Sequence, residues 1–168
     1  MQPGSTSEVV LDLEPGSYMF ATYAGEPFAR PLEVTAAPAD QPAEPEAEHT
    51  IRMFEFAFVD VPETLPAGPT TSNVVNEGGQ MHFMAVVSEE TLTPEQVQQS
   101  LSGTPLPFAA VTGSAGGMGE LAPGESGWAM LDLDPGVYVL TCNVFDLSDG
   151  VVGKAHTELG MSRAFTVE

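Results

Sequence analysis

Few residues of this chain can do metal chemistry, and they occur in a distinctive order. Cys142 is the only cysteine, His82 and His156 are two of the three histidines, and Met161 lies five positions after the second of them. One thiolate, two imidazoles and one thioether form a donor set that suits a copper ion cycling between its two oxidation states. The sequence therefore predicts a site for one copper ion, provided that the fold brings these four residues together.

The four residues stand at the ends of expected strands or in the loops between them. His82 comes just after a Gly-Gly turn, near the start of an apolar strand, and Cys142 ends a strand that returns from a Pro-Gly turn. His156 and Met161 lie on the loop before the last strand, where Gly160 eases the turn between them. A β-sandwich that gathers the ends of these strands at one pole would bring all four side chains together.

Short apolar runs separated by glycine and proline turns predict an all-β main domain over 49–168. Its strands are expected at 51–58, 71–76, 80–87, 126–133, 137–142 and 163–167. In the first of these, Phe54, Phe56 and Phe58 recur with a period of two, which predicts that they share one face of a strand. The glycine-rich stretch 113–119 is expected to be a flexible loop.

One short helix is expected between the histidine strand and the later hairpin. Thr93 and Gln96 form a capping box, and Pro94 stands at the first helical position, where proline is favoured. The helix should end near Leu101, because Gly103 follows it.

Residues 11–18 and 131–138 repeat one sequence, Leu-Asp-Leu-Glu-Pro-Gly-Ser-Tyr in the first copy and Leu-Asp-Leu-Asp-Pro-Gly-Val-Tyr in the second. The offset of 120 residues matches the length of one domain, so 1–36 is interpreted as the C-terminal half of an earlier copy. Thr22 stands where the main domain has Cys142, which predicts that the partial copy binds no metal. A linker rich in proline, alanine and glutamate joins the two at 37–48.

A few strands alone are marginally stable in water, so the partial copy is expected to dock on another surface. It either covers an edge of the main domain or completes a sheet in another chain. The second arrangement would make a homo-oligomer through the N-terminal partial repeat, and the sequence favours neither.

The chain has 24 acidic side chains against 4 basic ones, for a net charge of −20. Nucleic acids and anionic membrane surfaces are excluded as partners, because binding them requires clustered lysine and arginine. The acidity suits either salty surroundings or docking to a basic redox partner.

No apolar run is long enough to span a bilayer. The first residues also lack the basic and apolar regions of a signal peptide, so none is expected within this chain. Metal ligation would explain a lone thiol in an exported protein, and we expect a periplasmic, cell-surface or secreted location.

The chain resembles the cupredoxins, or blue copper proteins, in one ordered pattern: Asn76, His82, Pro135-Gly136-x-Tyr138-x3-Cys142, His156-x4-Met161 and Phe165-Thr-Val167. The resemblance covers about 51–168 and is strongest to bacterial cupredoxin-like domains with a long loop between cysteine and histidine. It implies a Greek-key β-sandwich in which His82, Cys142 and His156 are the strong ligands and Met161 is the weak axial one. Asn76 is expected to tie the ligand loops together. Thirteen residues separate Cys142 from His156, where plastocyanin-like proteins have only a few.

Four protein ligands leave no position open to a substrate, which predicts electron transfer rather than catalysis, with no catalytic residue. Three histidines are too few for a trinuclear oxidase centre beside this site, and one cysteine excludes a dinuclear centre bridged by two thiolates. Two alternatives stay open. The chain could be a cupredoxin-fold binding or structural module that uses no copper, or a copper storage or delivery protein.

Overall fold

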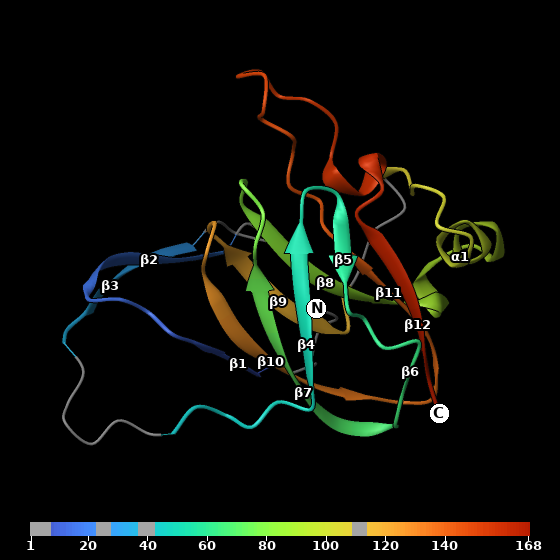
Figure 1. Cartoon of the computed structure of the whole chain (residues 1–168), viewed down its shortest axis with the longest axis horizontal. Coiled ribbons are helices and arrows are strands. Elements are labelled where there is room, and N and C mark those ends of the chain that lie inside the picture. The colour runs from blue at the N-terminus through green and yellow to red at the C-terminus, as the bar shows by residue number, and fades with distance from the viewer. Residues whose placement is uncertain (1–7, 23–27, 37–42, 109–113) are drawn as a thin grey trace. The chain divides into compact units, whose positions relative to one another are not determined.

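The computed structural model describes residues 8–22, 28–36, 43–108 and 114–168 (Figure 1). They form two compact units, of which one joins strand β1 to Pro45–Glu168 and the other is Asp12–Glu44. We call the first the sandwich unit and the second the hairpin unit. The domain boundaries expected after residues 36 and 48 stay a prediction.

The sandwich unit consists of two five-stranded sheets, ordered β1-β10-β7-β4-β5 and β6-β12-β11-β8-β9. The strands are β1 Glu8–Leu11, β4 His49–Phe54, β5 Ala57–Val59, β6 Thr64–Leu65, β7 Gly68–Asn76, β8 His82–Ser88, β9 Gly116–Leu121, β10 Ser126–Leu133, β11 Gly136–Thr141 and β12 Ser162–Val167. Neighbours in each sheet are often distant in sequence, as in a Greek key, and the predicted all-β sandwich is confirmed.

The main core lies between the two sheets, because alternate residues of each strand point inward. In β7, for example, Thr70, Ser72, Val74 and Asn76 are buried while the residues between them are half-buried. The apolar side chains that meet in this core include Ile51, Met53, Val74, Met84, Val86, Leu131, Leu140, Phe165 and Val167. The strands that lead to the candidate site are therefore held by packing in this core.

Helix α1, Pro94–Leu101, forms where the capping box predicts it. The Thr93 hydroxyl accepts a hydrogen bond from the backbone N–H of Gln96 at 3.2 Å, and the Gln96 side chain accepts one from the backbone N–H of Thr93 at 2.7 Å. Val97 joins a second apolar cluster on the outer face of a sheet, with Leu92, Leu106, Val87 and Val139.

Two expectations about the strands were wrong. The expected strand 51–58 is interrupted by a tight turn at Glu55 and Phe56 between β4 and β5, and Phe56 has a φ of 62°. That left-handed backbone takes its side chain off the face it would share with Phe54 and Phe58 in a continuous strand. The glycine-rich stretch is not a flexible loop from 116 onward but strand β9. A Cβ atom on Gly117 would lie 1.9 Å from the carbonyl oxygen of Met84, so this pairing requires glycine.

The hairpin unit consists of β2, Gly16–Thr22, paired antiparallel with β3, Phe28–Val34. Both strands lie within 1–36, the stretch that the sequence interprets as a partial copy. Among the residues that the structure describes, no helix has the length and apolar character that crossing a bilayer requires.

Candidate metal centre

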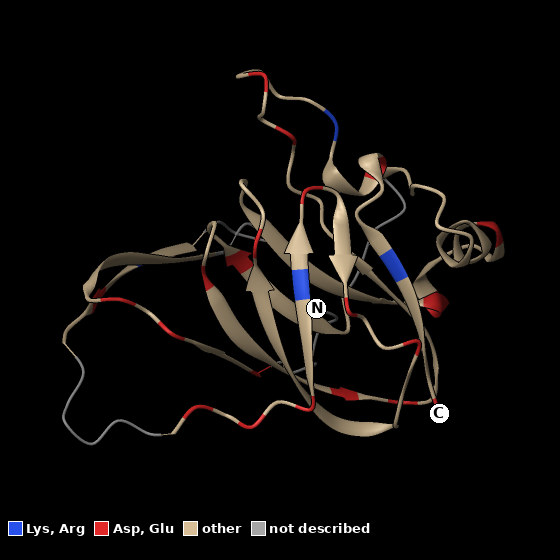
Figure 2. Cartoon of the chain, viewed as in Figure 1, with Lys and Arg blue, Asp and Glu red and all other residues tan. Residues whose placement is uncertain are grey.

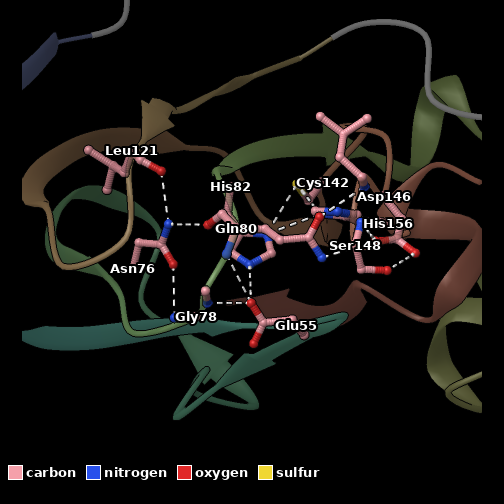
Figure 3. Close-up of polar contacts among 12 residues, drawn as sticks. Glu55, Asn76, Gly78, Gln80, His82, Leu121, Cys142, Asp146, Ser148 and His156 are labelled. Atoms are coloured by element: carbon pink, nitrogen blue, oxygen red, sulfur yellow. Dashed lines mark hydrogen bonds and ion pairs between the residues drawn. The ribbon is translucent and has the colours of Figure 1, made fainter. Parts of the chain in front are cut away.

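Three donor atoms from distant parts of the sequence meet at one end of the sandwich (Figure 3). The Nδ1 atoms of His82 and His156 lie 3.0 Å apart. The Sγ atom of Cys142 lies 4.0 Å from the first of these nitrogens and 3.6 Å from the second. All three residues have an exposed fraction of 0%. This His-Cys-His group could hold one copper ion.

The topology of one sheet explains why the three residues meet. β11 lies between β8 and β12 and is antiparallel to both, so the start of β8, the end of β11 and the start of β12 share one end of the sheet. His82 is the first residue of β8, and Cys142 follows directly after β11. His156 begins the short 3₁₀ helix η3, His156–Leu159, which leads into β12.

Backbone hydrogen bonds hold the last two ligand segments side by side. The backbone N–H of Thr157 donates to the carbonyl of Cys142 at 2.8 Å, and that of His156 donates to Val144 at 2.8 Å. Gly160, with a φ of 112°, ends η3 in the left-handed conformation that favours glycine. The positions of Cys142 and His156 are thus fixed by the main chain and not only by side-chain packing.

The chemistry of the donor set fits copper. Imidazole nitrogen and thiolate sulfur are the ligands of electron-transfer copper sites. The geometry agrees with this, because one proton shared between the two Nδ1 atoms would leave the nearby thiol sulfur outside the contact. One ion bound to His82, Cys142 and His156 would use a lone pair of each donor at once. The Nε2 atoms of both rings are also buried, and neither has a hydrogen-bond partner among the residues that the structure describes.

Burial controls the protonation of this group. It lowers the pKa of both histidines, because an apolar interior disfavours the imidazolium cation. The Glu55 carboxylate opposes this effect at His82, whereas His82 adds to it at His156. Burial raises the pKa of the Cys142 thiol, and the backbone N–H of Phe83, 3.5 Å from Sγ, opposes that change. The metal-free site therefore favours a neutral thiol, and metal binding would release its proton.

Asn76 joins the turn before His82 to the end of β9, whereas the sequence predicted that it would tie the ligand loops to one another (Figure 3). Its side-chain nitrogen donates to the carbonyl oxygens of Gln80 and Leu121, each at 2.8 Å. Its side-chain oxygen accepts from the backbone N–H of Gly78 at 3.0 Å. Asn76 is fully buried, so these bonds fix the turn that precedes His82.

Gln80 and Asp146 anchor the long loop between Cys142 and His156. The side chain of Gln80 donates to Asp146 at 3.1 Å and accepts from the backbone N–H of Leu147 at 3.1 Å. Asp146 also accepts from the backbone and hydroxyl of Ser148, at 3.0 and 3.1 Å. These bonds hold the pKa of Asp146 below its usual value. The loop is therefore fastened to the turn that carries His82.

The two-residue turn between β4 and β5 touches both imidazoles. Glu55 accepts hydrogen bonds from the backbone N–H groups of Gly79 and Gln80, and its Oε1 lies 3.8 Å from Nε2 of His82. The ring of Phe56 meets that of His156 edge to face, with centroids 5.2 Å apart. One turn thus lies against the outer side of both histidines.

The backbone of Met161 is hydrogen-bonded to the backbones of Cys142 and His156. Its carbonyl accepts from the backbone N–H of Cys142 at 3.3 Å, and its own N–H donates to His156 at 2.9 Å. The side chain is fully buried in the same apolar cluster as Cys142. Its assignment as the axial ligand stays a prediction. His49, the third histidine, begins β4 and does not join the group.

Sequence reasoning missed Glu55, Phe56, Gln80 and Asp146. Glu55 is one of 24 acidic residues and has no distinguishing neighbour in the sequence. Gln80 offered a weak signal, because it lies between the Gly-Gly turn and the histidine strand. The contribution of Phe56 depends on a left-handed backbone conformation that is rare for an aromatic residue.

No protein-family model and no curated protein match the chain. Solved structures do resemble it. A dithionite-reduced auracyanin from Roseiflexus castenholzii is 23% identical, with a TM-score of 0.48, over 73% of this chain and 99% of that one. Auracyanin A from Chloroflexus aurantiacus, described as a "blue" copper protein, is 19% identical, with a TM-score of 0.41, over 71% and 98%. A purple cupredoxin from Nitrosopumilus maritimus is 13% identical, with a TM-score of 0.40, over 73% and 100%.

The case for a metal site rests on the geometry of this chain. The two-sheet sandwich and the buried His-Cys-His group at one of its ends agree with what the sequence resemblance to the cupredoxins implies.

Proposed function

We propose that the chain is a mononuclear type 1 copper protein that transfers electrons and is not an enzyme. Its ligands are His82, Cys142, His156 and, as the weak axial donor, Met161. The convergence of two Nδ1 atoms and one Sγ atom in a fully buried pocket carries this proposal. The ion would supply a one-electron redox couple, and the chain would hold the donors in place during each change of oxidation state.

Burial of the donors supports transfer of electrons rather than binding of a substrate. The rings of His82 and His156 are covered by the β4–β5 turn, and their donor atoms point at each other and at sulfur. A site enclosed in this way favours outer-sphere exchange of an electron and offers no open position to a substrate. The anchors at Asn76, Gln80 and Asp146 would limit reorganisation of the donors.

A titration with Cu(II) tests the proposal on the full chain. We expect one equivalent of copper to produce an intense visible band from sulfur-to-copper charge transfer. Cys142→Ser should abolish the band, whereas His49→Gln should leave it unchanged, because His49 lies outside the group. Absence of the band from the unaltered protein, or its survival in Cys142→Ser, would contradict the proposal.

Met161 needs a separate test, because its role is more specific. Met161→Leu keeps an apolar side chain of similar volume and removes the sulfur. If the thioether is a weak axial donor, the visible band should persist and the reduction potential should rise, since Cu(II) loses a donor that stabilises it. An unchanged potential would show that Met161 only fills the core.

The alternatives make different predictions in the same experiments. A storage or delivery protein would bind copper but release it readily to a chelator and show no reversible redox couple. A binding module without copper would purify from its native host free of the metal. The second alternative is supported by the sequence repeat, in which Thr22 stands in place of Cys142.

The partner and location follow from the same proposal. Figure 2 shows acidic residues on strands, turns and helix α1 of the sandwich unit, against few basic ones. A basic redox protein would therefore be attracted, and its rate of association should fall as salt rises. We propose an exported location, periplasmic, cell-surface or secreted, where a lone thiol is protected by its metal.

A further inference from the structure

The two imidazoles of the site share one contact but differ in their surroundings. The Nδ1 atoms of His82 and His156 face each other at 3.0 Å, so in the metal-free protein one of them donates a proton and the other accepts it. Two arrangements satisfy this contact, and they differ in which ring presents its lone pair at Nδ1. The surroundings of the opposite nitrogens, Nε2, decide between them.

A carboxylate lies beside only one of these Nε2 atoms. Oε1 of Glu55 is 3.8 Å from Nε2 of His82, and Figure 3 shows the carboxylate next to the ring. Among the residues that the structure describes, no carboxylate forms an ion pair with His156, whose ring meets that of Phe56. The two histidines therefore differ in the charge that acts on them from outside the donor group.

The position of the Glu55 carboxylate is fixed by the turn that precedes His82. Its Oε1 accepts hydrogen bonds from the backbone N–H of Gly79 and, at 3.1 Å, from that of Gln80. Burial acts to raise the pKa of Glu55, but these bonds and one from its own backbone N–H outweigh it and hold the pKa below its usual value. A negative charge is thus held in place beside His82.

Gly78 permits this contact because it has no side chain. A Cβ atom at this position would lie 2.8 Å from Oε1 of Glu55 and 2.8 Å from Nε2 of His82, so it would force the two groups apart. A Cβ atom on Gly79 would lie 3.5 Å from the same Oε1, which is an ordinary contact. The approach of the carboxylate to the imidazole therefore depends on glycine at position 78 and not at 79.

We propose that Glu55 is a positioning residue of the copper site, whose charge keeps the proton of His82 on Nε2 and leaves the lone pair on Nδ1. The contact of 3.8 Å is longer than a hydrogen bond, so the carboxylate acts through its charge. A proton on Nε2 turns the positive end of the N–H dipole toward Oε1, whereas a lone pair there would be repelled. This inference rests on the proposed function only in naming copper as the ion that Nδ1 receives.

The same arrangement assigns the proton between the two rings. With Nδ1 of His82 as the acceptor, Nδ1 of His156 is the donor. His82 is then ready to bind an ion. His156 must first change its tautomer, which moves its proton from Nδ1 to Nε2 and leaves the ring neutral. The metal-free site therefore has one prepared imidazole and one that has to rearrange.

The charge of Glu55 should also act on the bound ion. A fixed negative charge favours the more positive of two oxidation states, so Glu55 should lower the reduction potential of copper held by His82. Its side chain is 41% exposed, and solvent screens part of this effect. Glu77 offers a contrast on the same segment, because its carboxylate lies 3.8 Å from the guanidinium of Arg52, which offsets its charge.

NMR of the metal-free full chain with isotope-labelled histidine tests the proposal, because proton–nitrogen correlations identify the protonated nitrogen of each ring. We expect the proton on Nε2 in His82 and on Nδ1 in His156. Glu55→Gln removes the charge but keeps an oxygen that can accept from the backbone. The turn should therefore persist, while His82 becomes a mixture of both tautomers. Glu77→Gln is the matched control and should leave the pattern unaltered.

Two further measurements separate the charge from the shape of the turn. Gly78→Ala displaces the carboxylate without removing it and should also mix the tautomers of His82, whereas Gly79→Ala should not. In copper-loaded protein, Glu55→Gln should raise the reduction potential by more than Glu77→Gln does, although each removes one negative charge.

Three results would overturn the proposal. One is a proton on Nδ1 of His82 in the unaltered protein, and another is an unchanged tautomer of His82 in Glu55→Gln. The third is an equal change of potential in Glu55→Gln and Glu77→Gln. The NMR measurement requires no metal, so it decides the role of Glu55 even if the chain fails to bind copper.

Discussion

The Nδ1 atoms of His82 and His156 lie 3.0 Å apart, although 74 residues separate the two histidines in the sequence. Two imidazoles in this orientation either share one proton or bind one ion. The nearby sulfur of Cys142 favours the ion, because a proton between the rings does nothing for the thiol. The contact also makes protonation of both rings at once unfavourable, since two buried cations would then face each other.

The metal-free protein should lose stability as the pH falls from 8 to 5. The folded state lowers the pKa of His82 and of His156, chiefly through burial, while the unfolded chain keeps the ordinary value of 6.5. Below that value the unfolded state binds more protons, so the free energy of unfolding decreases with falling pH until the folded state also titrates. Urea unfolding followed by Trp128 fluorescence measures this slope.

The control for this slope replaces both histidines with glutamine. Glu55 and Asp146 have lowered pKa values of their own, but the stability that they add is lost only as the pH falls below about 4.5. Measurements above pH 5 therefore isolate the histidines. An equal slope in the double variant would show that other groups cause it.

Asn76→Ala should destabilise the fold by about 2–4 kcal/mol, because three backbone groups lose a buried hydrogen-bond partner. Asn73→Ala, on the same strand but facing outward, should stay within about 0.5 kcal/mol of the unaltered protein. Chemical unfolding of both variants checks the difference. Similar values for the two would mean that solvent replaces the bonds of Asn76.

Gly117→Ala should destabilise the protein by about 3 kcal/mol or more, because the new Cβ would overlap the carbonyl of Met84 at a φ of 137°. Gly119→Ala is the matched change on the same strand, since nothing lies within 4 Å of its Cβ position. We expect that variant to change stability by about 0.5 kcal/mol or less. Denaturant midpoints report the contrast, and a tolerant Gly117 would mean that β9 can shift away from β8.

Phe56→Gly should expose the site without straining the turn. The metal-free Cys142 thiol is fully buried with a raised pKa, so we expect slow reaction with a thiol reagent. Removing the Phe56 ring uncovers His156 beside it and should accelerate labelling several-fold. Asp60→Gly controls for the backbone, because Asp60 is the other described non-glycine residue with positive φ. Equal labelling rates in the two variants would show that the ring is no barrier.

Much of the sandwich could be predicted because its strands obey local rules. Pro-Gly turns, alternating apolar residues and the capping box at Thr93 each act within a few residues, and each produced the expected element. The β4–β5 turn could not be predicted in this way. The alternation of Phe54, Phe56 and Phe58 is genuine, but tertiary contacts with the histidines outweigh it.

The ligands and their supports differ in how far the sequence indicates them. Cys142 and the two histidines stand out because their side chains are rare in this chain and have specific chemistry. Gln80 and Asp146 use common side chains, and their partners lie 66 residues away in the sequence. Only the folded topology brings them together, so no spacing rule could reveal them. Glycines 116 and 117 likewise suggest a loop until β8 is placed beside them.

The loop between Cys142 and His156 is closed at its base and open at its tip. The backbone N–H of Asp146 donates to Lys154 at 2.9 Å, and that of Gly153 donates to Asp146 at 2.8 Å. Val151 and Val152, beyond this closure, are 68% and 72% exposed. The tip is thus mechanically separate from the donor atoms. A linker for attachment to an electrode, or a dye, could therefore be introduced at Val151 or Val152 without moving the metal ligands.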